Sequence, residues 1–315
     1  MGLLGAGEMR VLSGGMSTEL EAAGFLKQGD PLWSARLLHT NPQAIKNVHT
    51  NFLKSGADVL STATYQASIE GFKTYLGMNG EEATELFNVG VCLAKEAVEE
   101  FTKQSPDKRK VLIAGSIGPY GAFLHDGSEY TGSYVRDHSV EDLKNWHRNQ
   151  MQSLASAGID LFAFETIPSQ KEAEALVQLL REFPNTKAWL SYSCQNISST
   201  SYGERFEEAV KVAAGTNQLV AVGVNCCSPD FVGPLLTAAN KNRDVNIDWI
   251  VYPNSGETWD NSLGWQTFKA EKRLSDYALE YVQLGARWIG GCCQTTPSDI
   301  ASLKEILLAS NPDVH

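Results

Sequence analysis

The sequence predicts a (β/α)₈ barrel, also called a TIM barrel, formed by residues 1–315 as a single domain. Eight short apolar runs alternate with amphipathic helical segments, and the composition changes little from one unit to the next. The runs are almost continuously apolar, as expected for strands buried on both faces of a parallel sheet. Single-domain α/β barrels commonly reach this length. A doubly wound open sheet is the alternative, because sequence periodicity does not report whether a sheet closes.

The eight predicted strands are distributed over the whole chain. They are Arg10 to Ser13, Val59 to Thr64, Val111 to Ser116, Leu161 to Phe164, Ala188 to Ser193, Val220 to Asn225, Trp249 to Tyr252, and Trp288 to Ile289. Two connections are longer than the others, from Gly14 to Asn41 and from Gly118 to Ser139. In a barrel both would leave the carboxyl ends of strands, where loops build the active site.

Capping patterns mark five helix starts between these strands. Three pair a capping residue with a following proline, and two resemble capping boxes. The five are Asn41-Pro42, Ser139 with Asp142, Ser169 with Glu172, Ser228-Pro229 and Thr296-Pro297. The helix after Ser169 has an apolar stripe that should pack against the sheet. The stripe consists of Ala173, Leu176, Val177 and Leu180.

The composition indicates a soluble intracellular protein and is compatible with a small cationic substrate. The balance of 26 basic and 37 acidic residues gives a net charge of −11, which argues against nucleic acid or an anionic membrane as partner. No run approaches the roughly 18 apolar residues of a membrane span, and the start of the chain lacks a signal-peptide pattern. We therefore expect a cytoplasmic protein, either a monomer or a small homo-oligomer. Its six cysteines should be metal ligands or reactive thiols, because disulfide frameworks belong to secreted proteins.

Three cysteines stand at the ends of predicted strands. Cys292 and Cys293 follow the eighth strand and are preceded by Gly290-Gly291, whereas Cys226 follows the sixth strand. Adjacent cysteines rarely pair with each other, because the ring closed through one peptide bond is strained. All strand exits of a barrel face one mouth, so these three thiols can converge. Three thiolates with one open position are typical of a catalytic zinc site.

The remaining cysteines and the histidines have simpler interpretations. Cys92, Cys194 and Cys227 are predicted to be structural, since free cysteine is usually found in protein cores. None of the six histidines follows a predicted strand, and we expect them in loops, helices or the tail. They are His39, His49, His125, His138, His147 and His315.

The cysteine segments Gly223-Val224-Asn225-Cys226 and Gly290-Gly291-Cys292-Cys293 resemble the zinc signature of the homocysteine S-methyltransferase family. The similarity extends over almost the whole chain and is closer to the branch that uses S-methylmethionine or S-adenosylmethionine than to the betaine branch. It continues through residues 14–21, 30–34, 64–67, 115–121, 126–130 and 251–257.

The resemblance implies a zinc-dependent methyltransferase with Cys226, Cys292 and Cys293 as the metal ligands. Zinc would deprotonate the thiol of homocysteine, which would then attack the methyl group of a sulfonium donor to form methionine. Glu165 resembles the family carboxylate that binds the homocysteine ammonium, and we take Glu165 and Asn225 as the catalytic candidates. The family usually has an acidic residue just before the first glycine pair, where this chain has Ser13. We expect Ser13 to change acceptor binding more than the class of reaction.

Several further residues are predicted to bind the substrates. A sulfonium donor is a cation, and each aromatic face can attract a cation by roughly 0.5–2 kcal/mol. The aromatic candidates in mouth loops or near strand exits are Trp33, Tyr65, Tyr120, Tyr130, Tyr134 and Tyr252, and Trp33, Tyr65 and Tyr252 are assigned to the substrate site. Asn254 and Ser255 could bind an amino-acid carboxylate. With Ser13, Gly14, Gly15 and Glu165, they complete the predicted substrate site.

Two other functions are compatible with the same residues. One is a related methyltransferase that uses betaine as donor or selenocysteine as acceptor. The other is a non-catalytic sensor in which the three cysteines store zinc or respond to oxidants. Methionine formation from a sulfonium donor separates the predicted function from both.

Overall fold

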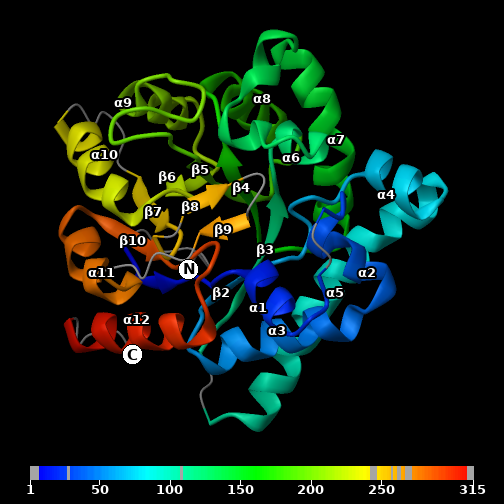
Figure 1. The fold of residues 1–315 in the computed structure, drawn as a ribbon, viewed down its shortest axis with the longest axis horizontal. Helices are drawn as coiled ribbons and strands as arrows, with labels where there is room; N and C mark the ends of the chain where they lie inside the picture. The colour runs from blue at the N-terminus through cyan, green and yellow to red at the C-terminus, as the bar shows by residue number, and fades with distance from the viewer. Residues whose placement is uncertain are drawn as a thin grey trace.

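A computed structural model shows eight parallel strands closed into a barrel and surrounded by helices (Figure 1). It describes residues 7–26, 29–106, 109–241, 247–256, 258–260, 264–266 and 272–310. The strand order is β1-β10-β7-β6-β5-β4-β3-β2. A parallel bridge between Leu12 and Val59 joins the first and last strands of this order, and the Ser13 amide donates to the Val59 carbonyl at 3.0 Å. The predicted barrel is therefore confirmed and the open-sheet alternative is wrong.

Each of the eight predicted strands is present, with ends that differ by a few residues. The barrel strands are β1 Arg10–Val11, β2 Val59–Ser61, β3 Leu112–Ile117, β4 Leu161–Ile167, β5 Lys187–Tyr192, β6 Leu219–Asn225, β7 Asp248–Tyr252 and β10 Ala286–Ile289. An antiparallel hairpin follows β7 and was not predicted. It consists of β8 Thr258–Asp260 and β9 Gly264–Gln266. Glu257, part of the motif that precedes the hairpin, lies outside the described residues.

Helices fill the connections between the strands. The α-helices are α1 Met16–Ala22, α2 Leu37–Thr40, α3 Pro42–Lys54, α4 Ile69–Leu76, α5 Gly80–Gln104, α6 Tyr120–Leu124, α7 Val140–Ser156, α8 Gln170–Leu180, α9 Phe206–Ala209, α10 Pro229–Lys241, α11 Leu274–Gln283 and α12 Pro297–Ser310. Four short 3₁₀ helices accompany them. They are η1 Trp33–Arg36, η2 Ser128–Tyr130, η3 Ser133–Arg136 and η4 Val210–Gly215. No helix in the described ranges is long and apolar enough to span a bilayer.

The predicted helix starts are confirmed, but one of the two capping boxes is only half formed. Ser139 and Asp142 exchange both bonds of a capping box at the start of α7. Ser169 accepts a hydrogen bond from the Glu172 amide, as a cap should. The Glu172 carboxylate does not return to the Ser169 amide, because it is bound instead to groups from other segments. A capping pattern alone does not reveal which donors compete for its acidic side chain.

The core has two layers. Side chains from alternating strand positions fill the inside of the barrel, including Trp189, Ile250 and Trp288, all at most 2% exposed. The opposite strand faces pack against the helices, and the predicted apolar stripe of α8 is buried there at 0–3% exposure. The interior layer also contains Tyr252 and extends to Cys292.

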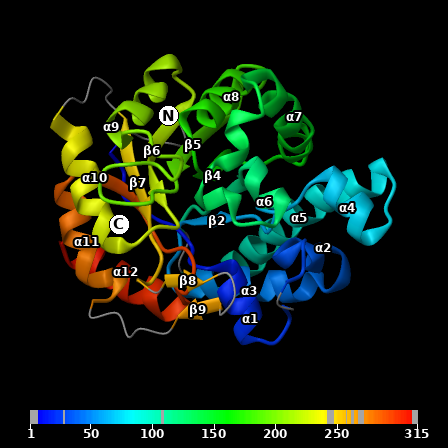
Figure 2. The same ribbon diagram turned by 45° about the horizontal axis from the view of Figure 1, so that its top comes forward.

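The long connections and the hairpin lie at the carboxyl end of the barrel. The β8–β9 hairpin lies beside α1, which follows β1, in both Figure 1 and Figure 2. The hairpin therefore lies at the end of the barrel where β1 ends. This arrangement places the residues after each strand at one mouth, as predicted for the site.

Candidate metal and substrate site

Three sulfur atoms meet at the barrel mouth. Because β6 and β10 flank β7 in the sheet, Cys226 lies close to Cys292 and Cys293 although 66 residues separate Cys226 from Cys292. The three Sγ atoms lie within 4.8 Å of one another, and those of Cys226 and Cys293 are 3.7 Å apart. The predicted convergence of these cysteines is confirmed.

Cys226 and Cys292 are joined by a disulfide, which the sequence analysis did not predict. Cys293 is a free thiol and is not paired with its neighbour Cys292, as expected. The physical reason for the difference is proximity: thiols close enough to share one metal ion are also close enough to oxidise to a disulfide. Reduction is required before both sulfur atoms can act as thiolate ligands.

The loop after β7 connects the two cysteine segments. The Cys292 amide donates to the Pro253 carbonyl at 2.8 Å, and the Ser255 amide donates to the Cys293 carbonyl at 3.1 Å. The Asn254 amide donates to the Cys227 carbonyl at 3.0 Å. The Asn254 Oδ1 atom is buried without a partner among the described residues. The predicted substrate residues Asn254 and Ser255 thus belong to the frame around the cysteines.

Glycines allow the first strand exit to pack closely on the turn that contains the cysteines. The Gly15 amide donates to the Thr295 carbonyl at 2.9 Å. A Cβ atom on Gly15 would lie 2.7 Å from the Cys292 carbonyl oxygen, and one on Gly14 would lie 2.7 Å from that of Thr295. On Gly291 it would lie 2.2 Å from Thr295 Oγ1. No side chain fits at these distances, so glycine is required for the close approach.

Asn225 connects β6 to the exit of β4. Its Oδ1 accepts a hydrogen bond from the Thr166 amide at 2.7 Å, and its Nδ2 donates to Thr166 Oγ1 at 2.8 Å. The same Nδ2 lies 4.0 Å from Cys292 Sγ. Thr166 and Cys226 have left-handed φ values of 60° and 47°, which cost free energy for residues with a side chain. Asn225 therefore stabilises an unfavourable backbone directly beside the sulfur cluster.

Glu165 lies at the end of β4 with a hydrogen bond to each carboxylate oxygen. Ser116 Oγ donates to Oε1, and the Tyr252 hydroxyl donates to Oε2 at 3.1 Å. Trp189 Nε1 in turn donates to the Tyr252 hydroxyl at 3.0 Å. Burial raises the pKa of Glu165 to about 7, although its two hydrogen bonds act in the opposite direction. Ser116 was not predicted as a site residue, and its place at the end of a strand was the signal that could have identified it.

A second carboxylate, that of Glu129 in η2, lies at the barrel mouth, where Ser193 after β5 donates to its backbone carbonyl at 3.0 Å. Burial raises its pKa to about 7. Its charge contributes, after burial, to the raised pKa values of Tyr65 and Tyr130. Glu129 belongs to a segment that resembles the family, but its role was not predicted, because a glutamate in a loop has no pattern that distinguishes it from a solvated one.

The predicted aromatic residues separate into two groups. Tyr65, Tyr130 and Tyr252 lie around the carboxylates, as their pKa shifts and hydrogen bonds show. Tyr120 and Tyr134 instead pack against each other with ring centroids 5.4 Å apart, in a cluster with Trp146 and Phe123. The Tyr134 hydroxyl donates to Glu172 within that cluster. Trp33 is half-buried at the start of η1, and its contact with substrate remains a prediction.

The other cysteines and histidines are placed largely as expected. Cys194 and Cys227 are buried, and burial raises the pKa of Cys227 to about 12. Cys92 is exposed on α5, so its expected place in the core is wrong; the outer face of a long helix accommodates it instead. Within the described chain no histidine joins the sulfur cluster, and His315 lies outside the described residues.

The three cysteines have the properties of a metal site. Burial raises the pKa of the Cys293 thiol to about 12, so a bound cation is needed to make it a thiolate at neutral pH. The cluster contains three cysteines and, within the described residues, no fourth histidine, cysteine or carboxylate ligand. A sulfur-rich set with one position left for another ligand fits zinc.

Comparisons with known proteins agree with this geometry. Residues 10–307 match the family model described as homocysteine S-methyltransferase. Homocysteine S-methyltransferase 1 of Zea mays is 43% identical over 311 residues, covering 96% of this chain and 95% of the relative. Betaine-homocysteine S-methyltransferase of Drosophila melanogaster is 41% identical over 308 residues, covering 94% and 93% of the two chains.

A solved relative has the same fold. The metallated form of the homocysteine methyltransferase MmuM from Escherichia coli superposes with a TM-score of 0.84 at 38% identity, covering 95% of this chain and 96% of that one. An oxidised form of the same relative also gives a TM-score of 0.84, at 39% identity and with coverages of 94% and 95%.

Proposed function

The chain belongs to the homocysteine S-methyltransferase family and is an enzyme of that family, and on this premise we propose that it transfers a methyl group from S-methylmethionine or S-adenosylmethionine to homocysteine with the help of zinc. The observation that supports the proposal most directly is the meeting of three cysteine sulfur atoms within 4.8 Å at the barrel mouth. The carboxylates around them suit substrates that carry an ammonium group.

In this proposal Cys226, Cys292 and Cys293 hold the zinc ion once the disulfide has been reduced. Bound zinc would lower the pKa of the homocysteine thiol, so that a nucleophilic thiolate is available at neutral pH. The three-cysteine set leaves one position for a ligand from solution. The ring of hydrogen bonds through Pro253 and Ser255 fixes the cysteine segments relative to each other.

Glu165 would bind the ammonium group of homocysteine. Ser116 and Tyr252 hold its carboxylate in place, and a bound ammonium favours the ionised form. Asn225 would act as a positioning residue, since its amide holds Thr166 beside the cluster. These contacts are made by strand ends, which keep the acceptor in one orientation.

The transfer itself forms one sulfur–carbon bond and breaks another. The electron pair of the acceptor sulfur forms the new bond to the methyl carbon, while the pair of the broken bond goes to the donor sulfur and neutralises its positive charge. The donor leaves as a thioether and the acceptor becomes methionine. No residue must remove a proton during this step, so the main contribution of the protein is to hold the two substrates at attack distance.

Zinc content and methionine formation, measured in one reduced preparation, test the proposal. We expect about one zinc per chain and turnover with a sulfonium donor, whereas Cys292→Ala should lose zinc and at least about 10³-fold in turnover. Cys92→Ala is the matched control, because Cys92 is an exposed cysteine on a surface helix. Full activity in zinc-free protein would contradict the mechanism.

Competition between substrates tests the choice of donor and acceptor. The fly relative is named for betaine, so betaine should be offered together with S-methylmethionine and S-adenosylmethionine, and selenocysteine together with homocysteine. We expect a sulfonium donor and homocysteine to be preferred. Zinc binding without turnover of any donor would indicate the sensor instead.

A further inference from the structure

One carboxylate oxygen of Glu129 receives no hydrogen bond from the residues that the structure describes. This atom, Oε2, is buried. A buried carboxylate oxygen without a donor costs free energy, more so when the group is ionised. Such a group in a native fold requires an explanation, and a ligand that supplies the missing donor is one.

The backbone of Glu129 is held firmly, so the position of its carboxylate is not that of a loose loop. Ser193 Oγ, at the exit of β5, donates to the Glu129 carbonyl at 3.0 Å, and Ser201 Oγ donates to Ser193 Oγ at 2.8 Å. On the other side the chain passes so close to Gly121 that a Cβ atom there would lie 2.6 Å from the Glu129 nitrogen. The backbone that carries the carboxylate is thus fixed before any ligand binds.

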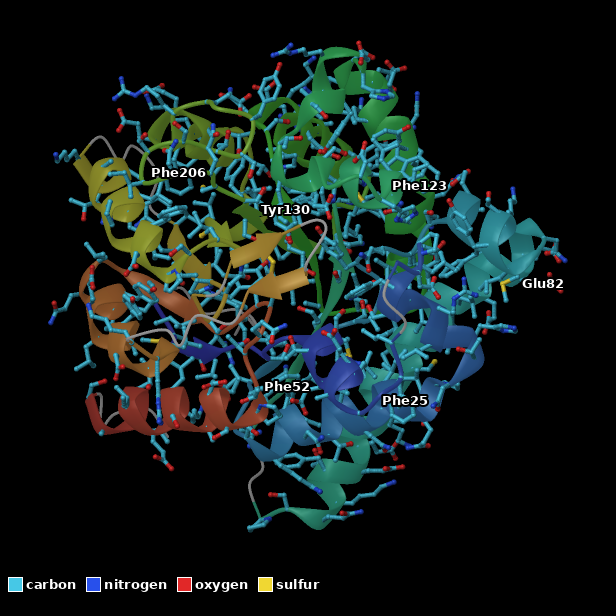
Figure 3. The ribbon with its side chains drawn as sticks, in the orientation of Figure 1. Phe25, Phe52, Glu82, Phe123, Tyr130 and Phe206 are labelled. Atoms are coloured by element: carbon cyan, nitrogen blue, oxygen red, sulfur yellow. A yellow bond between two sulfur atoms is a disulfide. The ribbon has the colours of Figure 1, made fainter. Side chains whose placement is uncertain are left out.

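The location of Glu129 relates it to the sulfur cluster. Ser193 Oγ, which donates to the Glu129 carbonyl, also lies 3.5 Å from the Thr166 carbonyl. The Thr166 amide donates to Asn225, the residue before Cys226. The neighbouring residue Tyr130 lies over the centre of the barrel in Figure 3, away from the periphery where Glu82 is seen. Because Ser193 follows β5 directly, this part of the loop lies at the barrel mouth.

Glu129 and Glu165 occupy two distinct places around the cluster. Burial and the hydrogen bonds from Ser116 and Tyr252 determine the pKa of Glu165, whereas burial, its own amide and Asp126 determine that of Glu129. Glu165 belongs to the barrel strand β4 and Glu129 to the 3₁₀ helix η2 in the connection after β3, so the pair suits two separate cationic groups.

We infer that Glu129 accepts a hydrogen bond from the ammonium group of the amino-acid methyl donor, while Glu165 serves the ammonium group of homocysteine. The inference rests on the proposed function, in which both substrates are amino acids. It explains the unpaired oxygen, because the donor brings the N–H groups that the protein does not supply. Betaine has no N–H group and would leave Glu129 Oε2 unpaired, so Glu129 also favours S-methylmethionine or S-adenosylmethionine over betaine.

The test compares Michaelis constants for the two substrates in the zinc-loaded enzyme. Glu129→Gln should raise KM for S-methylmethionine by about 10- to 100-fold and change KM for homocysteine less than about twofold, since one charged hydrogen bond is lost. Glu165→Gln should instead raise KM for homocysteine and leave KM for S-methylmethionine nearly unchanged. Asp137→Asn is the matched control, because it removes the same charge from an exposed position in the same connection. Both of its constants should stay at the wild-type values.

The possible outcomes separate the inference from the function on which it rests. If Glu129→Gln leaves KM for S-methylmethionine unchanged, or raises only KM for homocysteine, the inference is overturned. Turnover by the wild-type enzyme would still support the function. A wild-type enzyme without turnover of any sulfonium donor overturns the function itself. If Glu129→Gln does not fold, Glu129→Asp is the second test, because it keeps the charge but withdraws it by one methylene. Its KM for S-methylmethionine should rise, whereas its unfolding midpoint should stay that of the wild type.

Discussion

Glu172 and Glu129 are two carboxylates in the same half of the barrel with opposite surroundings. Glu172 is completely buried and accepts hydrogen bonds from the Tyr120 amide at 2.8 Å, from the Tyr134 hydroxyl, and from His147 Nε2 at 2.9 Å. Glu129 has a buried oxygen with no partner. The difference shows that burial alone does not identify a functional carboxylate; the number of donors that the protein itself supplies does.

Glu172 also stabilises the loop that contains Glu129. The donors to Glu172 come from the connection between β3 and α7 and from α7 itself, and that connection also contains Glu129. Glu172 therefore fixes both ends of the loop on which Glu129 lies. A saturated carboxylate contributes to the fold, and an unsaturated one in the same loop is left for a ligand.

Replacement of the saturated carboxylate should have the largest effect on the fold. Glu172→Ala leaves the Tyr134 hydroxyl, the Tyr120 amide and His147 without their acceptor, so we expect a loss of about 3–5 kcal/mol in the free energy of unfolding. Urea denaturation measures it. Glu182→Ala on the surface is the control and should cost much less, because its partner Arg148 stays solvated. Unchanged stability of Glu172→Ala would remove the distinction between the two carboxylates.

Glu165 is intermediate between these extremes, and its ionisation offers the next test. Burial raises its pKa from 4.5 to about 7, so between those pH values the folded protein holds a proton that the unfolded chain has released, and stability falls as pH rises through that window. Ammonium binding needs the ionised form. We therefore expect KM for homocysteine to fall about 10-fold from pH 6 to pH 8.

Glu165→Gln provides the control for that profile. It removes the titrating group and leaves Ser116, Tyr252, Tyr65 and the cysteines in place, so the pH dependence of the homocysteine constant should become nearly flat. The ionisation of the homocysteine thiol is common to both proteins and cancels in the comparison. If KM for homocysteine still depends on pH in Glu165→Gln as it does in the wild type, another group is responsible for the titration.

Most of the fold was predictable because it depends on local patterns. Apolar strand runs and capping residues predicted the barrel, and the residues at the strand exits predicted the cysteine cluster. The Cys226–Cys292 disulfide, the partners of Glu172 and the unpaired oxygen of Glu129 depend on contacts between segments far apart in sequence. The hairpin after β7 has two three-residue strands that pair with each other rather than with the barrel, and strands this short leave little pattern in a sequence.

The smallest expected effect concerns the position where the family usually has an acid. The Ser13 carbonyl accepts a hydrogen bond from the Gly291 amide at 3.4 Å, so this residue lies directly beside the segment that contains the cysteines. If Glu165 and Glu129 already supply the charge for the two ammonium groups, Ser13→Asp should lower KM for homocysteine only about two- to fivefold. Ser13→Asn, of the same shape without charge, is the control. A decrease of about 100-fold would mean that the two carboxylates leave the acceptor ammonium poorly bound, and that the missing acid is not compensated by residues elsewhere at the mouth.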